Sequence, residues 1–271
     1  MSRIAAKFEE LSFKKEGALV TFLVAGDPTP HLTLKMAEIL EDSGVDMIEL
    51  GLPFSDPVAD GSTIQASAAR ALQSGMNTDI YFALMKKIRE KVEVPLICLS
   101  YFNPILKSGI SRFITDCALS GVDGLIIPDL PVEEAREVME ESKKRGLDMI
   151  FLATPVTTEE RFKKIVSATS GFLYLVSLLG VTGVRKNLSP LLSSLVFKAK
   201  GYCKVPVVVG FGVSEPRHIL SIIEAGADGA IVGSALVKVI EENLRNRKIM
   251  LQRIGSISRK LKTATKIRSI F

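Results

Sequence analysis

The most regular stretch of the chain is VPVVVGFGVSEPRHILSIIEAGADGAIVGSALVKVI (205–240). It contains two short runs rich in β-branched residues, at 205–210 and 229–232. Each run is followed by a turn and by apolar residues at helical spacing, over 216–224 and 235–243. Apolar runs of this length are typical of strands that are buried on both faces, and strands that alternate with helices are typical of a parallel sheet. The stretch therefore predicts two consecutive βα units.

The same alternation continues through the whole chain. Most expected strands begin roughly 23 to 34 residues apart, the size of a βα unit, and eight such units close into a barrel of about 250 residues. No Gly-x-Gly-x-x-Gly follows the first strand, which disfavours a dinucleotide-binding sheet. We therefore predict an α/β fold, a single (β/α)8 TIM barrel domain over residues 1–271. The expected strands lie at 19–25, 46–50, 95–101, 124–128, 149–153, 172–177, 205–210 and 229–232.

Two additions to the barrel are expected. The N-terminal segment places Ile4, Phe8 and Leu11 on one helical face, so an extra helix should pack there on the body. The interval between the second and third strands is too long for one βα unit. Its segment GLPFSDPVADGSTIQASAARALQSG (51–75) predicts an extended loop and an extra helix after strand 2.

Composition excludes several classes of protein. No stretch approaches the roughly 18 apolar residues of a membrane span, and the N-terminus lacks the apolar core of a secretion signal, so we expect a cytoplasmic protein. The three cysteines lie far apart and the two histidines fall near expected helix starts, which predicts neither a metal site nor a catalytic triad. Much of the net charge of +5 lies at 245–268, which we interpret as a solvated final helix and tail rather than a nucleic-acid surface.

Three similar corners, at 43–46, 120–124 and 225–229, place glycine at a helix end and aspartate just before a strand. They should lie at the bottom of the barrel and contribute stability. Chemistry is expected at the opposite end, because the active sites of such barrels lie at the carboxyl ends of the strands.

Glu49 is the most informative residue at those strand ends. Alternation puts Met47 and Glu49 on one face of the second strand. Either face of a barrel strand is covered, by the interior or by helices, so a carboxyl group there should be partly desolvated, which raises its pKa toward the range useful for acid–base catalysis. A structural carboxylate is an equally good interpretation from spacing alone. Asp56 and Asp60 follow in the loop SDPVADG, where ordinary turn chemistry competes with a catalytic role.

Glycine-rich turns follow the last three strands. The glycines at 183, 210, 212 and 233 allow backbone N–H groups to approach an anion, and Ser234 begins a helix whose N-terminus carries partial positive charge. Neighbouring turns of this kind predict a phosphate site. Apolar residues at other strand ends suggest a flat slot beside the carboxylates, although each alone is as well explained as core. They are Phe22, Leu99, Tyr101, Ile126 and Phe211.

The motifs FLVAGDP, IELGLPFSDPVADGSTIQ, YFNPI, PDLPVEE, YLVSLLGVTG, VVVGFGVS and GAIVGSALVK resemble those of the tryptophan synthase α subunit family over nearly the whole chain. The resemblance implies a lyase that splits indole-3-glycerol phosphate into indole and glyceraldehyde 3-phosphate. Glu49 takes the acid/base position and protonates indole C3, and Asp60 binds the indole N–H. Tyr174 matches a tyrosine near Glu49. Phe22, Leu99, Tyr101, Ile126 and Phe211 match the indole slot, and Thr182, Gly183, Gly212, Gly233 and Ser234 match the phosphate end.

The resemblance also implies a partner. Members of the family work in αββα complexes in which indole passes to a β subunit that holds pyridoxal phosphate, so no cofactor is expected in this chain. The contact with the β subunit falls on Asp56 and Pro57, the strand 3 loop at 102–107 and Asp129 in the strand 4 loop. A mobile lid is implied at 180–183. Leu178, Leu179 and Ser62 depart from residues frequent in the family, which affects the expected lid dynamics and partner communication more than the chemistry.

Three alternatives remain at this point. The chain could be a stand-alone lyase that releases free indole. It could be another phosphate-binding barrel enzyme, such as a sugar-phosphate isomerase or epimerase, for which Asp27 and Thr154 are the candidate groups at strands 1 and 5. It could also serve chiefly as an activator of a partner. No lysine lies at an expected strand end, which disfavours Schiff-base aldolase chemistry.

Overall fold

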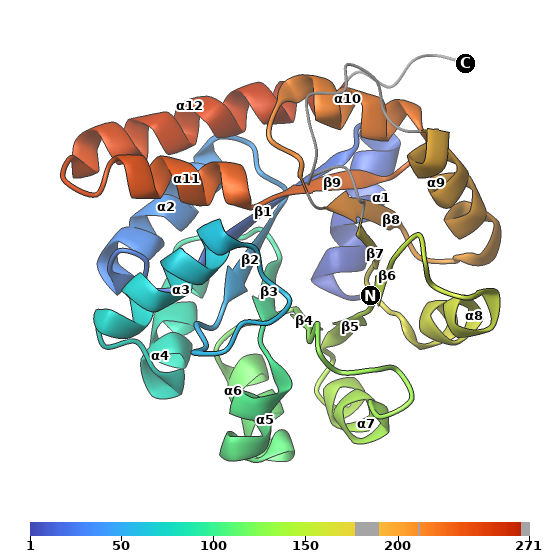
Figure 1. The fold of residues 1–271 in the computed structure, drawn as a ribbon, viewed down its shortest axis with the longest axis horizontal. Helices are drawn as coiled ribbons and strands as arrows, with labels where there is room; N and C mark the ends of the chain where they lie inside the picture. Colours follow the sequence, from blue (N-terminus) through green and yellow to red (C-terminus); the bar gives the residue numbers. More distant parts are fainter. Residues whose placement is uncertain (177–189, 211, 267–271) are drawn as a thin grey trace.

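The computed structural model describes residues 1–176, 190–210 and 212–266. Figure 1 shows a ring of strands surrounded by helices, as expected for an α/β barrel. The strands are β1 (Ala18–Val24), β2 (Met47–Gly51), β3 (Leu96–Leu99), β4 (Gly124–Ile126), β5 (Asp148–Ile150), β6 (Leu152–Ala153), β7 (Leu173–Val176), β8 (Val207–Gly210) and β9 (Gly229–Val232).

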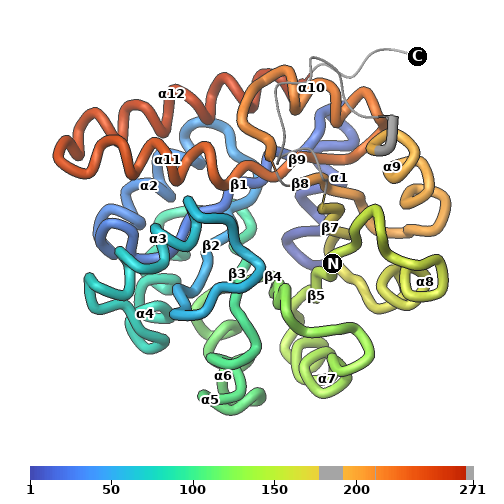
Figure 2. The backbone as a smooth tube through the Cα atoms, in the orientation of Figure 1, coloured from blue at the N-terminus to red at the C-terminus, as the bar shows by residue number. Residues whose placement is uncertain are grey.

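The strands form one parallel sheet in the order β5-β4-β3-β2-β1-β9-β8-β7-β6. Only Phe151 separates β5 from β6, so these two short strands together occupy the fifth position of an eight-membered barrel. β5 pairs with β4 and β6 pairs with β7, which closes the ring. Figure 2 shows that the chain passes once around the ring, so that the first and last units meet where β1 pairs with β9. The eight-strand barrel prediction is confirmed.

The helices follow the expected alternation. Both additions are present, the N-terminal helix and the extra helix α3 after β2. No helix in the described parts of the chain is long and apolar enough to cross a membrane. The helices are α1 (Arg3–Lys14), α2 (Pro30–Asp42), α3 (Ser62–Gln73), α4 (Thr78–Arg89), α5 (Phe102–Ser108), α6 (Ile110–Leu119), α7 (Arg136–Lys144), α8 (Glu159–Ala168), α9 (Pro190–Tyr202), α10 (Pro216–Glu224), α11 (Ser234–Glu242) and α12 (Arg247–Thr265).

Two boundaries differ from the sequence-based expectation. The segment at 102–107, expected as a loop, is the short helix α5, which has Pro104 in its first turn, where proline is tolerated. A helix of two turns is too short to show a clear apolar period. The sequence has apolar residues at helical spacing over 132–145, which predicts a helix there. Helix α7 begins only at Arg136, because Pro131 and Val132 accept hydrogen bonds in tight turns instead.

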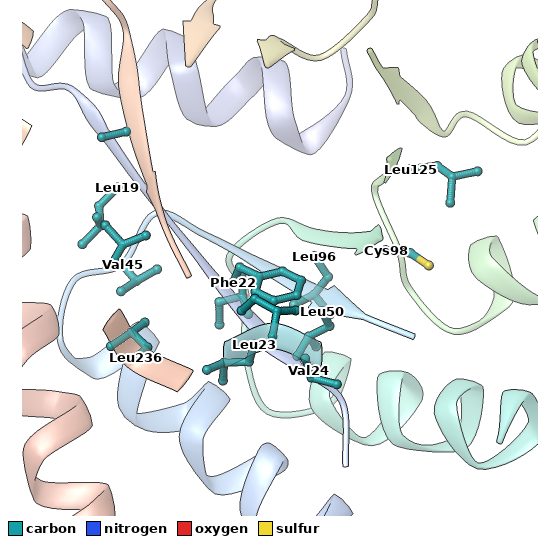
Figure 3. Packing of buried hydrophobic residues seen from close by; sticks show 14 of the residues in the cluster. Leu19, Phe22, Leu23, Val24, Val45, Leu50, Leu96, Cys98, Leu125 and Leu236 are labelled. Carbon is teal, nitrogen blue, oxygen red and sulfur yellow. The ribbon is translucent and has the colours of Figure 1, made fainter. Parts of the chain in front are cut away.

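The core has two layers. Residues that point into the barrel form one cluster with the apolar face of α1, which covers one end of the ring. That cluster includes Val20, Met47, Ile97, Ile126, Ile150, Val208 and Ile231 from the strands and Ile4, Phe8 and Leu11 from α1. Residues that point outward from the strands pack against the surrounding helices, and Figure 3 shows Leu50, Leu96, Cys98 and Leu125 in this layer. Both faces of each strand are therefore buried, as the apolar runs predicted.

The three repeated corners lie at the starts of strands, at the bottom of the barrel. Each corner glycine, Gly44, Gly121 or Gly226, has a positive φ of 84°, 83° or 93°, a conformation that favours glycine. Each following aspartate accepts a hydrogen bond of 2.7–2.9 Å from the backbone N–H of a neighbouring chain segment. The pairs are Asp46 with Leu19, Asp123 with Leu96, and Asp228 with Val207. The corners therefore join adjacent strands.

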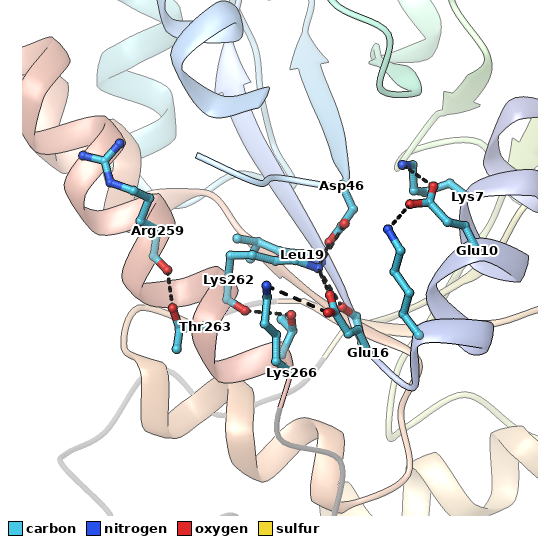
Figure 4. Close-up of polar contacts among 12 residues, drawn as sticks. Lys7, Glu10, Glu16, Leu19, Asp46, Arg259, Lys262, Thr263 and Lys266 are labelled. Carbon is cyan, nitrogen blue, oxygen red and sulfur yellow. Dashed lines mark hydrogen bonds and ion pairs between the residues drawn. The ribbon is translucent and has the colours of Figure 1, made fainter. Parts of the chain in front are cut away.

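The final helix was expected to be solvated, and this prediction is wrong for one face. α12 packs against α10, α2 and α11, and it buries Met250, Ile254 and Leu261. Lys262 is also buried, and its Nζ lies 2.8 Å from Asp46 Oδ2 and 3.1 Å from Glu16 Oε2 (Figure 4). The segment is basic in composition, but it forms an amphipathic helix in which one lysine makes buried ion pairs.

Candidate active site

Glu49 lies in the middle of β2. Its side chain follows Met47 by two residues, and Met47 belongs to the cluster inside the barrel, so Glu49 also points inward. Phe22 on β1 and Ile97 on β3 are its neighbours in register. Only 1% of the Glu49 surface is exposed. The inward orientation that the proposed chemistry requires is therefore present.

The carboxyl group of Glu49 has an unusual environment. Among the described residues, its Oε2 atom has no hydrogen-bond partner. Burial raises the pKa of Glu49 to about 8, and the negative charge of nearby Asp60 contributes to the rise. Among the described residues, no cation counters these two effects. The group is therefore largely protonated at neutral pH and can donate a proton.

Asp60 is held at the mouth of the barrel by the loop after β2. Its Oδ2 accepts a hydrogen bond of 3.0 Å from the hydroxyl group of Tyr101. The same hydroxyl accepts the backbone N–H of Ala59 at 2.9 Å, and the ring of Phe54 lies 5.5 Å from the ring of Tyr101. Burial raises the pKa of Asp60, whereas the bond from Tyr101 lowers it. Tyr101 was expected only as an indole contact, and no local pattern indicated that it also orients a carboxylate.

Tyr174 on β7 completes the carboxylate end. It packs against the cluster inside the barrel. Burial raises its pKa well above the usual value, as do the negative charges of Glu49 and Asp60. A Cβ atom on Gly210 would lie 2.4 Å from the Tyr174 hydroxyl oxygen. Gly210 was expected among the anion-binding glycines, and the structure adds a steric reason for it, since any larger residue would displace Tyr174.

The expected indole-slot residues are partly brought together. Phe22 lies between two glycines, since a Cβ on Gly51 would be 2.9 Å from its Cε2 and a Cβ on Gly233 would be 3.1 Å from its Cδ1. Leu99 on β3 is half-buried and pairs in register with Ile126 on β4. Ile126, the last residue of β4, is fully buried inside the barrel. Phe211 lies outside the described residues.

The expected phosphate end lies where β8 and β9 finish. Gly233 is the N-cap residue of α11 and Ser234 is its first residue, and no side chain of the described residues caps this helix. The first N–H groups of a helix have no partner within the helix, so they can bind an anion. Gly212 follows β8 with a positive φ of 74°. Thr182 and Gly183, the remaining expected phosphate residues, lie outside the described residues, as does the lid at 180–183.

The expected partner-contact residues lie on the rim. Asp56 is exposed and accepts a hydrogen bond of 2.5 Å from the hydroxyl of Ser55, and Pro57 is half-buried. Asp129 Oδ1 accepts the backbone N–H of Phe102 at 2.9 Å, which connects the β4 loop to the start of α5. Loops and the short helix on this rim also expose apolar side chains. They are Val58, Leu106 and Val156.

The residues required by the isomerase alternative are otherwise engaged. Asp27 is fully buried, and its carboxylate accepts hydrogen bonds from Arg70 and Ser67. Thr154 exchanges hydrogen bonds with Thr157 in its own turn. In the chain as described, no cluster of three histidine, cysteine or acidic residues is arranged to hold a metal ion. Neither Asp27 nor Thr154 is therefore free to act on a substrate.

The parallel α/β barrel holds a buried inward acid with a second carboxylate beside it, and a helix begins two strands away, at the end of β9. This arrangement defines a class, the barrel enzymes that act on small phosphorylated substrates by acid–base chemistry. The family model described as "Tryptophan synthase alpha chain" matches residues 8–266. This chain belongs to the tryptophan synthase alpha chain family. The family predicted from the motifs is therefore confirmed.

Individual relatives agree with the family model. A tryptophan synthase alpha chain from Methanosarcina acetivorans is 48% identical over 240 residues, which cover 89% of this chain and 87% of that protein. One from Geotalea uraniireducens is 46% identical, with 98% of both chains covered. Among solved structures, tryptophan synthase subunit alpha from Legionella pneumophila superposes with a TM-score of 0.90 at 36% identity, with 98% of both chains covered. A chain in the tryptophan synthase a2b2 complex from Pyrococcus furiosus gives 0.85 at 41% identity, covering 91% of this chain and 98% of that one.

Proposed function

We propose that this chain cleaves indole-3-glycerol phosphate into indole and glyceraldehyde 3-phosphate, in the last steps of tryptophan biosynthesis. The observation that carries the proposal is the buried, inward-pointing carboxyl group of Glu49 in the barrel, near the carboxylate of Asp60. The cleaved bond joins an aromatic carbon to the glycerol chain, so the reaction needs a proton donor for that carbon and a stable negative charge near the ring nitrogen.

The two carboxyl groups divide these tasks. Glu49 donates its proton to indole C3, which places positive charge on the ring nitrogen. Asp60 accepts a hydrogen bond from the indole N–H and stabilises that charge, while Tyr101 holds Asp60 in place. The glycerol hydroxyl next to the ring then loses its proton to the Glu49 carboxylate and becomes the aldehyde carbonyl. The carbon–carbon bond breaks, its electron pair restores the aromatic ring, and Glu49 is again protonated.

The remaining site residues bind and orient the substrate. Phe22, Leu99 and Ile126 contact the flat face of the indole ring, and Tyr174 lies beside the glycerol chain near Glu49. At the other end, Gly212 and the first N–H groups of α11, at Gly233 and Ser234, bind the phosphate group. The same assignment includes Phe211 for the ring and Thr182 and Gly183 for the phosphate. Binding energy at the phosphate holds indole C3 against the acid.

The proposal extends to the partner and the cell. We place this chain in a complex with a tryptophan synthase β subunit, with Asp56, Pro57 and Asp129 at the contact. The exposed apolar side chains of Val58, Leu106 and Val156 on the same rim support a protein partner there. No cofactor is assigned to this chain, since pyridoxal phosphate belongs to the β subunit, and the protein acts in the cytoplasm.

The test is an indole-release assay on the purified chain, alone and with a tryptophan synthase β subunit. We expect indole from the wild-type chain and almost none from Glu49→Gln, with binding of glycerol 3-phosphate retained in both. Near-normal turnover by Glu49→Gln would reject the mechanism. A wild-type chain that releases no indole, even with the β subunit, would reject the activity. Equal turnover with and without the β subunit would favour a stand-alone lyase.

A further inference from the structure

Asp27 and α3 are joined by a buried ion pair near the active site. The carboxylate of Asp27 follows β1 and is fully buried. Arg70 on α3 donates from Nε to Oδ1 at 2.9 Å and from Nη2 to Oδ2 at 2.7 Å, and Ser67 donates its hydroxyl to Oδ2 at 2.5 Å. Ser67 and Arg70 lie on one face of the helix, so three hydrogen bonds fix that face to the end of β1.

The start of α3 determines where Asp60 lies. Gly61 is the N-cap residue of α3, directly after Asp60. The side chain of Gln65, within the first turn, donates from Nε2 to the backbone carbonyl of Asp60 at 2.9 Å. A shift of α3 along its axis would therefore move the Asp60 backbone, against the hydrogen bonds that join Asp60 to the hydroxyl of Tyr101 and to the carbonyl of Pro57.

Arg70 also faces the helix at the phosphate end. Its Nη1 lies 3.5 Å from Oε1 of Glu241 on α11, and α3 packs against α11. The same helix, α11, begins at Ser234 beside the expected phosphate site. The guanidinium group of Arg70, on the helix that follows Asp60, thus contacts both the end of β1 and the helix α11 that begins at the expected phosphate site.

We propose that Arg70 is a positioning residue for the cleavage reaction: through Asp27 it fixes α3, and thereby sets the place of Asp60 relative to Glu49 and to the phosphate end. This inference rests on the proposed function. A buried ion pair adds little net stability compared with apolar residues of similar volume, so its main physical effect is to define one register. The planar, bidentate guanidinium group is suited to that task because it matches a carboxylate in only a few orientations.

The test compares Arg70→Met and Arg70→Lys with a matched control, Arg253→Met. Arg253 pairs with Glu242 of the same helix α11 at 2.9 Å, but it lies on α12 away from the site. For each chain, kcat and KM for indole-3-glycerol phosphate, the pH profile of kcat, the affinity for glycerol 3-phosphate and the thermal midpoint are measured. The assay includes the β subunit.

We expect Arg70→Met to lower kcat by about 10- to 100-fold, because a displacement of about 1 Å in a reacting group has effects of that size. KM and the affinity for glycerol 3-phosphate should change by less than about threefold. The upper limb of the kcat–pH profile should move to lower pH, because a displaced Asp60 no longer raises the pKa of Glu49. Arg70→Lys should lie between Arg70→Met and wild type, and Arg253→Met should match wild type.

Other outcomes overturn the proposal. The proposal is wrong if folded Arg70→Met has the kcat and the pH profile of wild type. It is also wrong if kcat falls only in step with thermal stability and the pH profile does not move. If Arg70→Met fails to fold because Asp27 is left unpaired, Asp27→Asn with Arg70→Met removes that charge and is judged by the same criteria. Should that variant also fail to fold, Arg70→Lys alone decides. An inactive wild-type chain would instead reject the proposed function.

Discussion

The bottom and the top of the barrel each bury a carboxyl group along the second strand. Asp46 precedes β2 and is 6% exposed, and Glu49, three residues later, is 1% exposed. Burial raises the pKa of both groups. At Asp46 this effect is opposed by Lys262 and by the backbone N–H of Leu19 (Figure 4). At Glu49, no cation or backbone donor within the described part of the chain opposes the effect of burial, and the charge of Asp60 adds to it.

The difference shows how one strand serves two purposes. A buried carboxylate with a cation and a backbone donor connects elements that are far apart in sequence, here β1, β2 and α12. A buried carboxyl group without such partners keeps its proton at neutral pH, which makes it a reactive acid at the cost of stability. The predictions below test this division, beginning with the largest expected effect.

Replacement of Glu49 by glutamine should separate activity from stability. Glutamine has nearly the same shape but no proton to donate, so we expect indole release to fall by about 10²- to 10⁴-fold. The free energy of unfolding at pH 8 should stay the same or rise, because no ionisable group remains in the buried site. Steady-state indole assays and urea unfolding measure the two quantities. A marked loss of stability would show that Glu49 is a structural group like Asp46.

Replacement of Lys262 by methionine should lower stability and leave activity unchanged. It leaves Asp46 buried without its cation, and the loss of one partner of a buried pair typically costs about 3–5 kcal/mol of unfolding free energy. The kcat of the folded protein should stay near that of wild type, because the site lies at the other end of the barrel. Lys266→Met is the control. Lys266 is the C-cap residue of α12, and its exposed side chain lies 3.9 Å from Glu16. Equal stability of the two variants would contradict the role given to Lys262.

The raised pKa of Glu49 predicts a pH dependence of stability. Below the ordinary pKa of 4.5, both the folded and the unfolded chain hold the proton. Between that value and about 8, the unfolded chain ionises while the folded chain stays protonated. The contribution of Glu49 to the free energy of unfolding therefore falls as pH rises, by up to about 1.4 kcal/mol per pH unit, and it becomes constant above the folded pKa.

This contribution is measured as the difference in unfolding free energy between wild type and Glu49→Gln at several pH values. The variant should gain relative to wild type from about pH 5 to pH 8. The kcat of wild type should fall about tenfold per pH unit above the pKa of Glu49, because the acid is lost. A stability difference that does not change with pH would mean that Glu49 is ionised in the folded chain.

The comparison also explains what could be predicted from the sequence. Strand and helix alternation is local, so the eight strand positions and α3 followed from spacing, as did the shared face of Met47 and Glu49. Asp46 was assigned to a stabilising corner from its Gly-Val-Asp turn, but its partner Lys262 is more than two hundred residues away, and no local pattern identified it. The basic composition of α12 suggested a solvated face instead.

At the top of the barrel, sequence patterns again identified residues but not the contacts between distant segments. The motifs identified Glu49, Asp60 and Tyr101 as site residues. The hydrogen bond from Tyr101 to Asp60 and the space that Gly210 leaves for Tyr174 depend on loops and strands that meet only in the folded chain. The sequence also made Asp27 a candidate catalytic group, whereas its bonds to Arg70 and Ser67 appear only when β1 and α3 are packed together.

The smallest expected effect concerns the second corner of the bottom end. Asp123 accepts the backbone N–H of Leu96 at 2.9 Å and pairs with two arginines, Arg89 at 3.2 Å and Arg3 at 3.3 Å. Arg3 is more than half exposed, whereas Arg89 is mostly buried. Arg3→Met leaves Asp123 with two partners, so it should cost about 0–1 kcal/mol of unfolding free energy in urea and leave kcat unchanged. If Arg3→Met lowers the unfolding free energy as much as Lys262→Met does, each carboxylate at the bottom depends on all of its partners for stability. The bottom carboxylates would then differ from Glu49, whose Oε2 has no partner among the described residues, by more than single ion pairs suggest.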